Sequence, residues 1–211
     1  MNDIKQIHSS KWIFCLIVVL ILVVDQATKI WIKTHMTLHE CIDITGWFKI
    51  CFIENNGMAY GMELGSKLLL SSIRVVLVTM IIFYVVRQIK STVPKGYLIC
   101  LSMIVGGAIG NIIDGVFYGL IFSESSNLFV ADFVPFGTGY APVLMGKVVD
   151  MLYFPLIEST WPAFVPFVGG QPFVFFSPVF NVADANISVG VCALLLFYRK
   201  RLSSLMQKDN S

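Results

Sequence analysis

Charged residues are scarce in this sequence. Only 13% of its 211 residues are charged, whereas 56% are hydrophobic. Because soluble globular domains contain about 25% charged residues, this composition excludes an ordinary soluble domain and predicts an integral membrane protein. The net charge of +2 is too small to indicate a nucleic-acid partner. Internal repeats and low-complexity tracts are also absent, so we expect a single domain over residues 1–211.

The motifs of several enzyme classes are missing as well. The five cysteines form no C-x-x-C pair, which excludes a zinc ribbon or a dithiol redox site. No G-x-S-x-G motif is present, so a serine nucleophile is not predicted. His35 and His39 have the spacing of metal ligands on a helix, but the glutamate of H-E-x-x-H is lacking, and we interpret them as solvated polar residues. We therefore expect no metal and no cofactor. Cys41 and Cys51 share a loop and are able to pair, but we expect them to stay unpaired.

Four apolar runs are long enough to be membrane spans, because about 20 apolar residues cross the hydrocarbon core of a bilayer. They cover about residues 11–33, 67–87, 96–122 and 178–198. The first run continues to Trp31 without an A-x-A cleavage site, so we expect a retained span and no removed leader. The fold class that we predict is an all-α membrane protein with four transmembrane helices and a small β-rich extracytoplasmic element.

Lysine and arginine gather at the N-terminus, in the loop after the second run, and at the C-terminus. Such positively charged segments remain in the cytoplasm, so both termini are predicted to lie there and the segments 34–66 and 123–177 to face outward. The first outer segment alternates apolar and polar residues, which predicts short strands. The second is rich in aromatic residues, which suits either anchoring in the headgroup layer or a clamp over bound acyl chains.

Four aspartates lie in these runs or beside them: Asp25, Asp114, Asp150 and Asp184. A carboxylate in hydrocarbon is costly unless it is paired or faces a wet cavity, so each is a functional candidate. At a rise of 1.5 Å per residue, the three within runs fall roughly 5 to 10 Å below the outer surface, and Asp150 can fold back onto them. Two carboxylates that share a proton supply a base for water and an acid for a carbonyl. The alternative is that the carboxylates only join helices by hydrogen bonds.

Five stretches give this pattern a family resemblance. In chain order they are DQATK (25–29), NNGMAY (55–60), GGAIGNIID (106–114), VVDM (148–151) and FNVAD (180–184). Their order and their placement on the spans resemble those of the lipoprotein signal peptidases, the bacterial type II signal peptidases, which are four-span aspartyl proteases. Other intramembrane aspartyl proteases are not indicated, because no G-x-G-D motif is present.

The resemblance implies a role for each matching residue. Asp150 and Asp184 correspond to the catalytic pair of the family. The residues that orient this pair and the substrate, or that build the polar wall around it, correspond to Asp25, Lys29, Asn55, Asn111, Asp114 and Asn181.

The resemblance also implies a substrate and a location. The family removes the signal peptide of a diacylglyceryl-modified prolipoprotein by cutting just before the lipidated cysteine. We therefore expect an aspartic endopeptidase of the bacterial cytoplasmic (inner) membrane, whose active site faces outward. Its expected partners are lipid-modified prolipoproteins and membrane lipids but no nucleic acid, and we expect a monomer.

The sequence departs from the family pattern in three places. Gly115 stands where the family usually has arginine, and either Arg74 or Lys147 is able to replace that cation. Met151 stands where the family has phenylalanine. The segment between the aspartates of the third and fourth stretches is unusually long, and it contains a rival match at Val130–Phe133 with Asp132 as its carboxylate. We favour Asp150, because the apolar context of VVDM matches the family.

Two other functions use the same carboxylates. One is a proton-coupled transporter or proton relay, although four spans are few for a transporter core and no inverted repeat is visible. The other is a non-catalytic lipid-binding or assembly protein.

Overall fold

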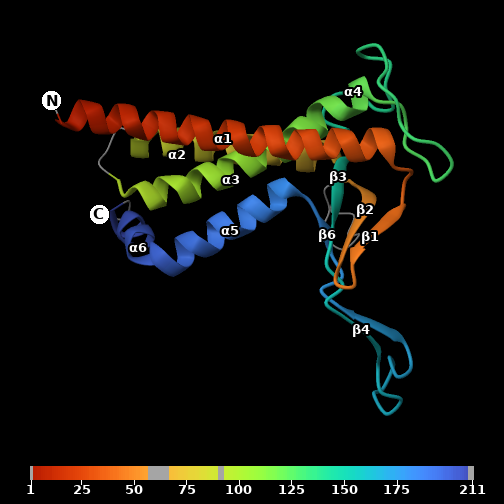
Figure 1. The fold of residues 1–211 in the computed structure, drawn as a ribbon. Helices are drawn as coiled ribbons and strands as arrows, with labels where there is room; N and C mark the ends of the chain where they lie inside the picture. The colour runs from red at the N-terminus through yellow and green to blue at the C-terminus, as the bar shows by residue number, and fades with distance from the viewer. Residues whose placement is uncertain (1, 57–66, 90–92, 209–211) are drawn as a thin grey trace.

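Long helices run along one direction and a β-sheet lies at one end of them, as Figure 1 shows. This computed structural model describes residues 2–56, 67–89 and 93–208. The long helices are α1 (Asn2–His35), α2 (Lys67–Ile89), α3 (Lys95–Ile113) and α5 (Val182–Phe197). The chain continues from α3 through the π-helical turn η2 (Asp114–Tyr118) into α4 (Gly119–Ile121), and α6 (Arg199–Lys208) follows α5. Because α3 packs against both α1 and α5, it is the central helix of the bundle.

Within the part of the chain that the structure describes, three helical segments are long and apolar enough to cross a membrane: residues 10–35, 67–89 and 95–121. Their outward surface is apolar, and side chains such as Leu20, Met80 and Phe83 are more than half exposed. Such a surface is stable only when lipid is the solvent. The fourth predicted run forms an apolar helix only from Val182, and this helix is shorter than the other three.

Glycines in α3 let its neighbours approach closely. A Cβ atom added at Gly107 would lie 2.4 Å from the carbonyl oxygen of Ala183 in α5. A Cβ atom added at Gly110 would lie 2.6 Å from Oδ2 of Asp25 in α1. Any larger residue would therefore separate the helices, so these glycines allow the close helix packing.

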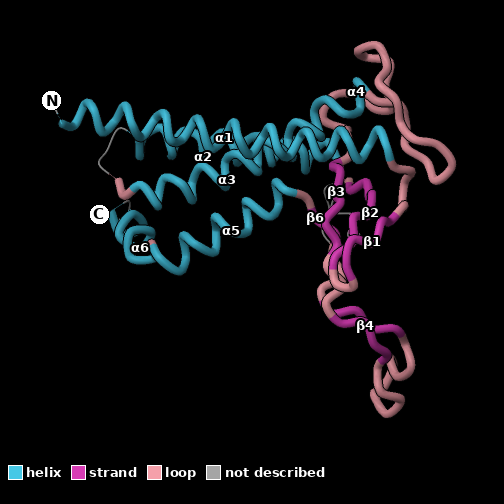
Figure 2. The backbone as a smooth tube through the Cα atoms, viewed as in Figure 1, coloured by secondary structure: helices cyan, strands magenta, loops and turns pink. Residues whose placement is uncertain are grey.

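The sheet is antiparallel and has the strand order β1-β2-β3-β6. Its strands are β1 (Cys41–Thr45), β2 (Phe48–Asn55), β3 (Val148–Tyr153) and β6 (Val179–Phe180). They gather at the end of the bundle where α1 ends (Figure 2). The predicted small β-rich element is therefore present, but the label all-α is too narrow: helix and sheet are mixed, because β3 and β6 of the second outer segment join the hairpin of the first.

A disulfide joins Cys41 to Cys51. The expectation that these cysteines stay unpaired is wrong, because the register of β1 and β2 places them directly opposite each other. Adjacent positions of an antiparallel pair are close enough for such a bond. The crosslink closes the hairpin that carries the first half of the sheet.

A separate two-stranded sheet projects from the second outer segment. Strands β4 (Ile157–Thr160) and β5 (Pro172–Phe175) pair with each other and with no other described strand. We call residues 155–177 the β4–β5 arm. Figure 1 shows the arm extending away from both the helices and the main sheet.

We predict that Gly107→Ala lowers stability by about 2 kcal/mol, because its Cβ must displace the backbone of α5. Gly115→Ala is the matched control, since nothing lies within 4 Å of a Cβ atom there. Its thermal midpoint in detergent is expected to be unchanged or raised. Equal thermal midpoints for the two purified variants would contradict this account of the α3–α5 contact.

Candidate active site

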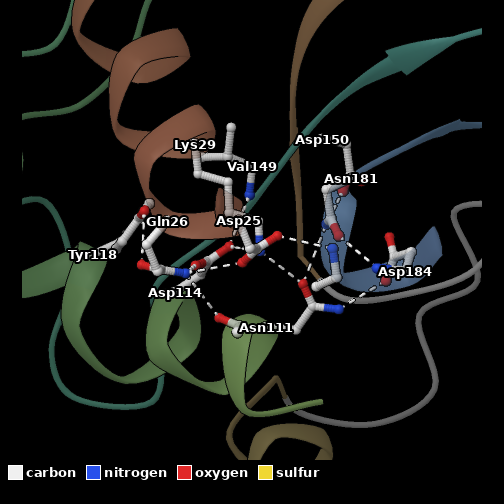
Figure 3. A network of polar contacts seen from close by, with 12 residues as sticks. Asp25, Gln26, Lys29, Asn111, Asp114, Tyr118, Val149, Asp150, Asn181 and Asp184 are labelled. Carbon is white, nitrogen blue, oxygen red and sulfur yellow. Dashed lines mark hydrogen bonds and ion pairs between the residues drawn. The ribbon is translucent and has the colours of Figure 1, made fainter. Parts of the chain in front are cut away.

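A buried ion cluster joins α1 to the end of α3 (Figure 3). Asp25 and Lys29 lie one helical turn apart on α1, and Asp114 begins η2. Lys29 Nζ is 2.9 Å from Asp25 Oδ2 and 2.8 Å from Asp114 Oδ2, and all three side chains have no exposed surface. Removing one partner of such a buried group leaves an uncompensated charge, so the three residues depend on one another.

Both carboxylates of the cluster also accept hydrogen bonds from the backbone of α5, which carries Asp184, and of β3, which carries Asp150. Asp25 Oδ1 accepts a hydrogen bond from the N–H of Ala183 in the first turn of α5, at 2.9 Å. Asp114 Oδ2 accepts one from the N–H of Val149 in β3, at 3.3 Å. The ion cluster therefore fixes the backbone beside Asp184 and beside Asp150.

Two asparagines connect the ion cluster to those aspartates. The Oδ1 atom of Asn111 accepts from Lys29 Nζ at 2.9 Å, and its Nδ2 donates to Asp184 Oδ1 at 2.7 Å. Asn181 Nδ2 donates to Asp150 Oδ1 at 2.7 Å and to Asn111 Oδ1 at 3.2 Å. Because Asn111 and Asn181 touch each other, one continuous chain of contacts runs from Lys29 to both carboxylates.

Asn181 has a second role as the N-cap of α5. Its Oδ1 atom accepts from the N–H of Asp184 at 2.8 Å, which satisfies one of the free donors in the first turn of the helix. The same side chain therefore fixes the start of α5 and holds Asp150.

Asp150 and Asp184 form a pair at the end of this network. Asp150 is 3% exposed, and it also accepts a hydrogen bond from Asn55 Nδ2 at 3.2 Å. Burial, and then the negative charge of nearby Asp184, raise the pKa of Asp150 to about 7. Below about pH 7 the pair therefore contains a protonated Asp150.

The structure brings all the predicted site residues into this one network, with the ion cluster on one side and the pair on the other. The rival Asp132 is exposed in the loop after α4, where it contacts Ser123 only through backbone groups. The predicted stretch at 55–60 lies outside the described residues from position 57 onward.

Gln26 and Tyr118 were missed by the sequence analysis. Gln26 Nε2 donates to Asp114 Oδ1 at 2.9 Å and to Asp25 Oδ2 at 3.1 Å, and Tyr118 donates to Gln26 Oε1 at 3.1 Å. Gln26 lies inside the DQATK stretch, so the family resemblance of that stretch could have identified Gln26 as a site residue. No sequence signal marks the π-helical turn that places Asp114 and Tyr118, although such turns are frequent at functional sites.

A second buried ion cluster anchors the long loop after α4. Lys33 and Lys147 both pair with Glu54 of β2, and Ser125 donates to the same carboxylate. Burial alone would raise the pKa of Glu54, but the charge and hydrogen bond of Lys33 hold it below its ordinary value. Lys147 is thus committed to a structural contact, at 2.9 Å from Glu54 Oε2.

Arg74 of α2 lies near Gly115, the position at which the family pattern has a cation. A small pocket is lined by both residues, together with Ser71, Asn111 and Gly146. Because Asn111 also binds Asp184, this pocket adjoins the aspartate pair.

An apolar groove of about 370 Å³ adjoins the pair on the side of α1. Trp31 of α1, Ile50 of β2 and Leu152 of β3 form part of its wall. Met151 and Val182 also line it, and they directly follow Asp150 and Asn181 in the chain. The groove therefore suits an apolar chain beside the carboxylates.

We predict that Lys29→Met lowers stability by about 3 to 5 kcal/mol, because Asp25 and Asp114 then lose their buried partner. Adding Asp25→Asn and Asp114→Asn should recover much of this loss, since an amide oxygen still accepts from the backbone. Thermal unfolding in detergent measures both the loss of stability and its recovery.

The control for this series is Lys49→Met, which removes an exposed ion pair with Asp43 and should change stability by less than about 1 kcal/mol. A Lys29→Met protein as stable as the wild type would refute the dependence of the fold on this cluster.

Comparisons with known proteins are consistent with this geometry. The family described as Signal peptidase (SPase) II matches residues 17–199. The lipoprotein signal peptidase of Porphyromonas gingivalis is 49% identical over 191 residues, which are 90% of this chain and 84% of that protein. That of Amoebophilus asiaticus is 36% identical over 206 residues, covering 93% and 82%. A solved bacterial membrane enzyme is 22% identical with a TM-score of 0.60 over 90% of each chain, which shows the fold.

Proposed function

Since this chain belongs to the signal peptidase II family, we infer that it is a membrane protease that removes signal peptides from prolipoproteins. The family assignment decides against the proton-coupled transporter and the assembly protein that the carboxylates alone allowed. What remains is how this chain performs the reaction.

We propose that Asp150 and Asp184 are the catalytic residues of an aspartic-type endopeptidase. The observation that carries this proposal is the pair itself: two carboxylates, each held by an asparagine, one of them with its pKa raised to about 7. The ionised member takes a proton from water, which attacks the scissile carbonyl, and the protonated member donates to the carbonyl oxygen. The member that took the water proton then gives it to the leaving amine as the C–N bond breaks, and the other member recovers its proton from the hydroxyl of the tetrahedral intermediate, so each alternates between acid and base.

The other residues of the network hold this pair in place. Asn111 and Asn181 orient the two carboxylates, and Asn55 donates a hydrogen bond to Oδ2 of Asp150. Asp25, Lys29 and Asp114 fix the backbone from which the pair projects. A helical signal peptide must unwind locally before it is cut, and polar groups around the pair are then available to its freed backbone.

The apolar groove beside Asp150 is proposed to take an acyl chain of the diacylglyceryl group. Its wall is formed almost wholly by apolar side chains, including Trp31 and Leu152. Met151 lines the groove and directly follows Asp150 in β3, so a lipid bound there would lie one residue along the strand from the pair, on the opposite face.

We propose that α5 is a fourth membrane span and that the sheet faces outward. Its 16 residues cover about 24 Å, less than the ~30 Å core, so its first turn lies several ångströms below the outer boundary. That depth agrees with the sequence estimate for Asp184. The disulfide between Cys41 and Cys51 supports an oxidising compartment for the sheet. Both termini then lie in the cytoplasm, and the protein acts in the bacterial inner membrane as a single-domain monomer surrounded by lipid.

Exchanging the aspartates tests the proposed pair. We expect Asp150→Asn and Asp184→Asn each to reduce cleavage of a diacylglyceryl-modified prolipoprotein by a factor of about 10³, because the pair then lacks its base or its acid. Asp132→Asn should leave cleavage unchanged, since Asp132 lies apart from the network. The gel shift of the purified substrate measures cleavage by all three variants, and thermal unfolding checks that each variant is folded. Activity that survives Asp150→Asn but not Asp132→Asn would reverse the assignment.

The pH dependence follows from the raised pKa of Asp150. Below about pH 7 the pair keeps its shared proton, and above it the proton is lost, so kcat/KM should fall with a midpoint near 7. Asn55→Ala removes a hydrogen bond that favours the ionised Asp150, so it should move the falling limb to higher pH. Initial rates between about pH 5 and 9 test this. A flat profile, or a limb that Asn55→Ala moves to lower pH, would contradict the assignment.

A further inference from the structure

The β4–β5 arm has an unusual composition for a projecting surface element. Its residues 155–177 include six aromatic side chains and a single charged one, Glu158. At its tip, Phe164 is 85% exposed and Phe167 is 99% exposed, and Leu156 and Ile157 near its base are about half exposed. A contiguous apolar surface of this kind marks an interaction site.

The tip is held in shape by its own backbone. The N–H of Trp161 donates to the carbonyl of Gln171, and the N–H of Gly170 donates back to the carbonyl of Trp161. The Trp161 ring packs edge-on against Phe173, with ring centroids 4.8 Å apart. The backbone of Phe167 has a φ of 69°, in the left-handed region that bulky residues avoid. A strained backbone that presents a fully exposed ring indicates that the ring has a partner outside the chain.

An aromatic cluster fixes the base of the arm to the main sheet. Phe154 stacks on Phe48 at 4.7 Å, on Phe180 at 5.6 Å and on Trp47 at 6.1 Å between ring centroids. Phe176, at the other end of the arm, packs edge-on against Phe180. Both ends of the arm are thus joined to strands of the sheet, and its direction is set.

That direction runs along the membrane surface. In Figure 1 the arm leaves the sheet at the level of the C-terminal end of α1 and extends across the direction of the helices. At this end of α1, Trp31 stacks on His35, and Trp31 is about half exposed, as is common for tryptophan at a membrane interface. The apolar surface of the arm therefore continues the lipid-facing surface of the bundle at headgroup level.

We propose that the β4–β5 arm is an interfacial anchor whose partner is the outer leaflet, with Phe164 and Phe167 inserted at the boundary of headgroups and acyl chains. The arm contains no lysine or arginine, so apolar burial drives its insertion and attraction to anionic headgroups does not. This inference goes beyond the peptidase activity, and it rests on the membrane orientation proposed above.

Trp161 is a natural reporter for the test. Phenylalanine replaces Trp12, Trp31 and Trp47 in the full chain, which is reconstituted into nanodiscs of phosphatidylcholine. We expect nitroxide placed near the headgroup or on the upper acyl chain to lower Trp161 fluorescence about twofold, and aqueous iodide to have little effect. Phe164→Ser with Phe167→Ser should reverse this preference, with thermal unfolding in detergent unchanged.

Phe136→Ser is the matched control, because Phe136 is 73% exposed in the loop between α4 and β3, outside the arm, and its loss should leave Trp161 quenching unaltered. Adding anionic lipid, or raising salt from about 0.02 to about 0.5 M, should also have no effect. Quenching by iodide but not by lipid nitroxides would overturn the proposal. So would crosslinking of Phe164→Cys to a second copy of the chain with Trp161 shielded from both quenchers, since the occupant would then be protein.

Discussion

A buried ammonium group organises the polar interior of this protein. Lys29 has no exposed surface, and a lone charge at such a place is unstable, so the fold must bring carboxylates to it. Asp25 comes from the same helix and Asp114 from the end of α3. Each carboxylate has further oxygen lone pairs, and these bind N–H groups of α5 and β3. One cation therefore sets the relative positions of four elements, including the two that carry the aspartate pair.

The asparagines between Lys29 and the pair matter because an amide does not titrate. A direct contact with the ammonium group would favour the ionised form of Asp150 and hold its pKa down. Instead Asn111 and Asn181 carry the connection through hydrogen bonds, and Lys29 is only a minor influence on a pKa that burial and Asp184 raise. The ion cluster thus supplies rigidity without removing the shared proton.

The convergence of Asp25, Asp114 and Asp184 was predicted from the sequence, because a carboxylate in an apolar run has few stable positions and helical rise places the three at similar heights. Asp150 was found differently, through the resemblance of VVDM to a family motif, since a loop residue has no height to calculate. The disulfide and the four-stranded sheet were not predicted, because strand register is a long-range property that short alternating runs leave open. The π-helical turn was also missed, because it depends on packing around Asp114 and not on local composition.

The proposed position of the site below the outer boundary requires backbone that is neither helix nor solvated loop at membrane depth. Such backbone is stable only where protein satisfies its polar groups. Here β6 pairs with β3, and in the first turn of α5 the N–H groups of Ala183 and Asp184 donate to Asp25 and Asn181. A short α5 also leaves the sheet close to lipid instead of above it. An aromatic arm along the surface then stabilises the sheet at that level, because lifting the sheet would expose the rings to water.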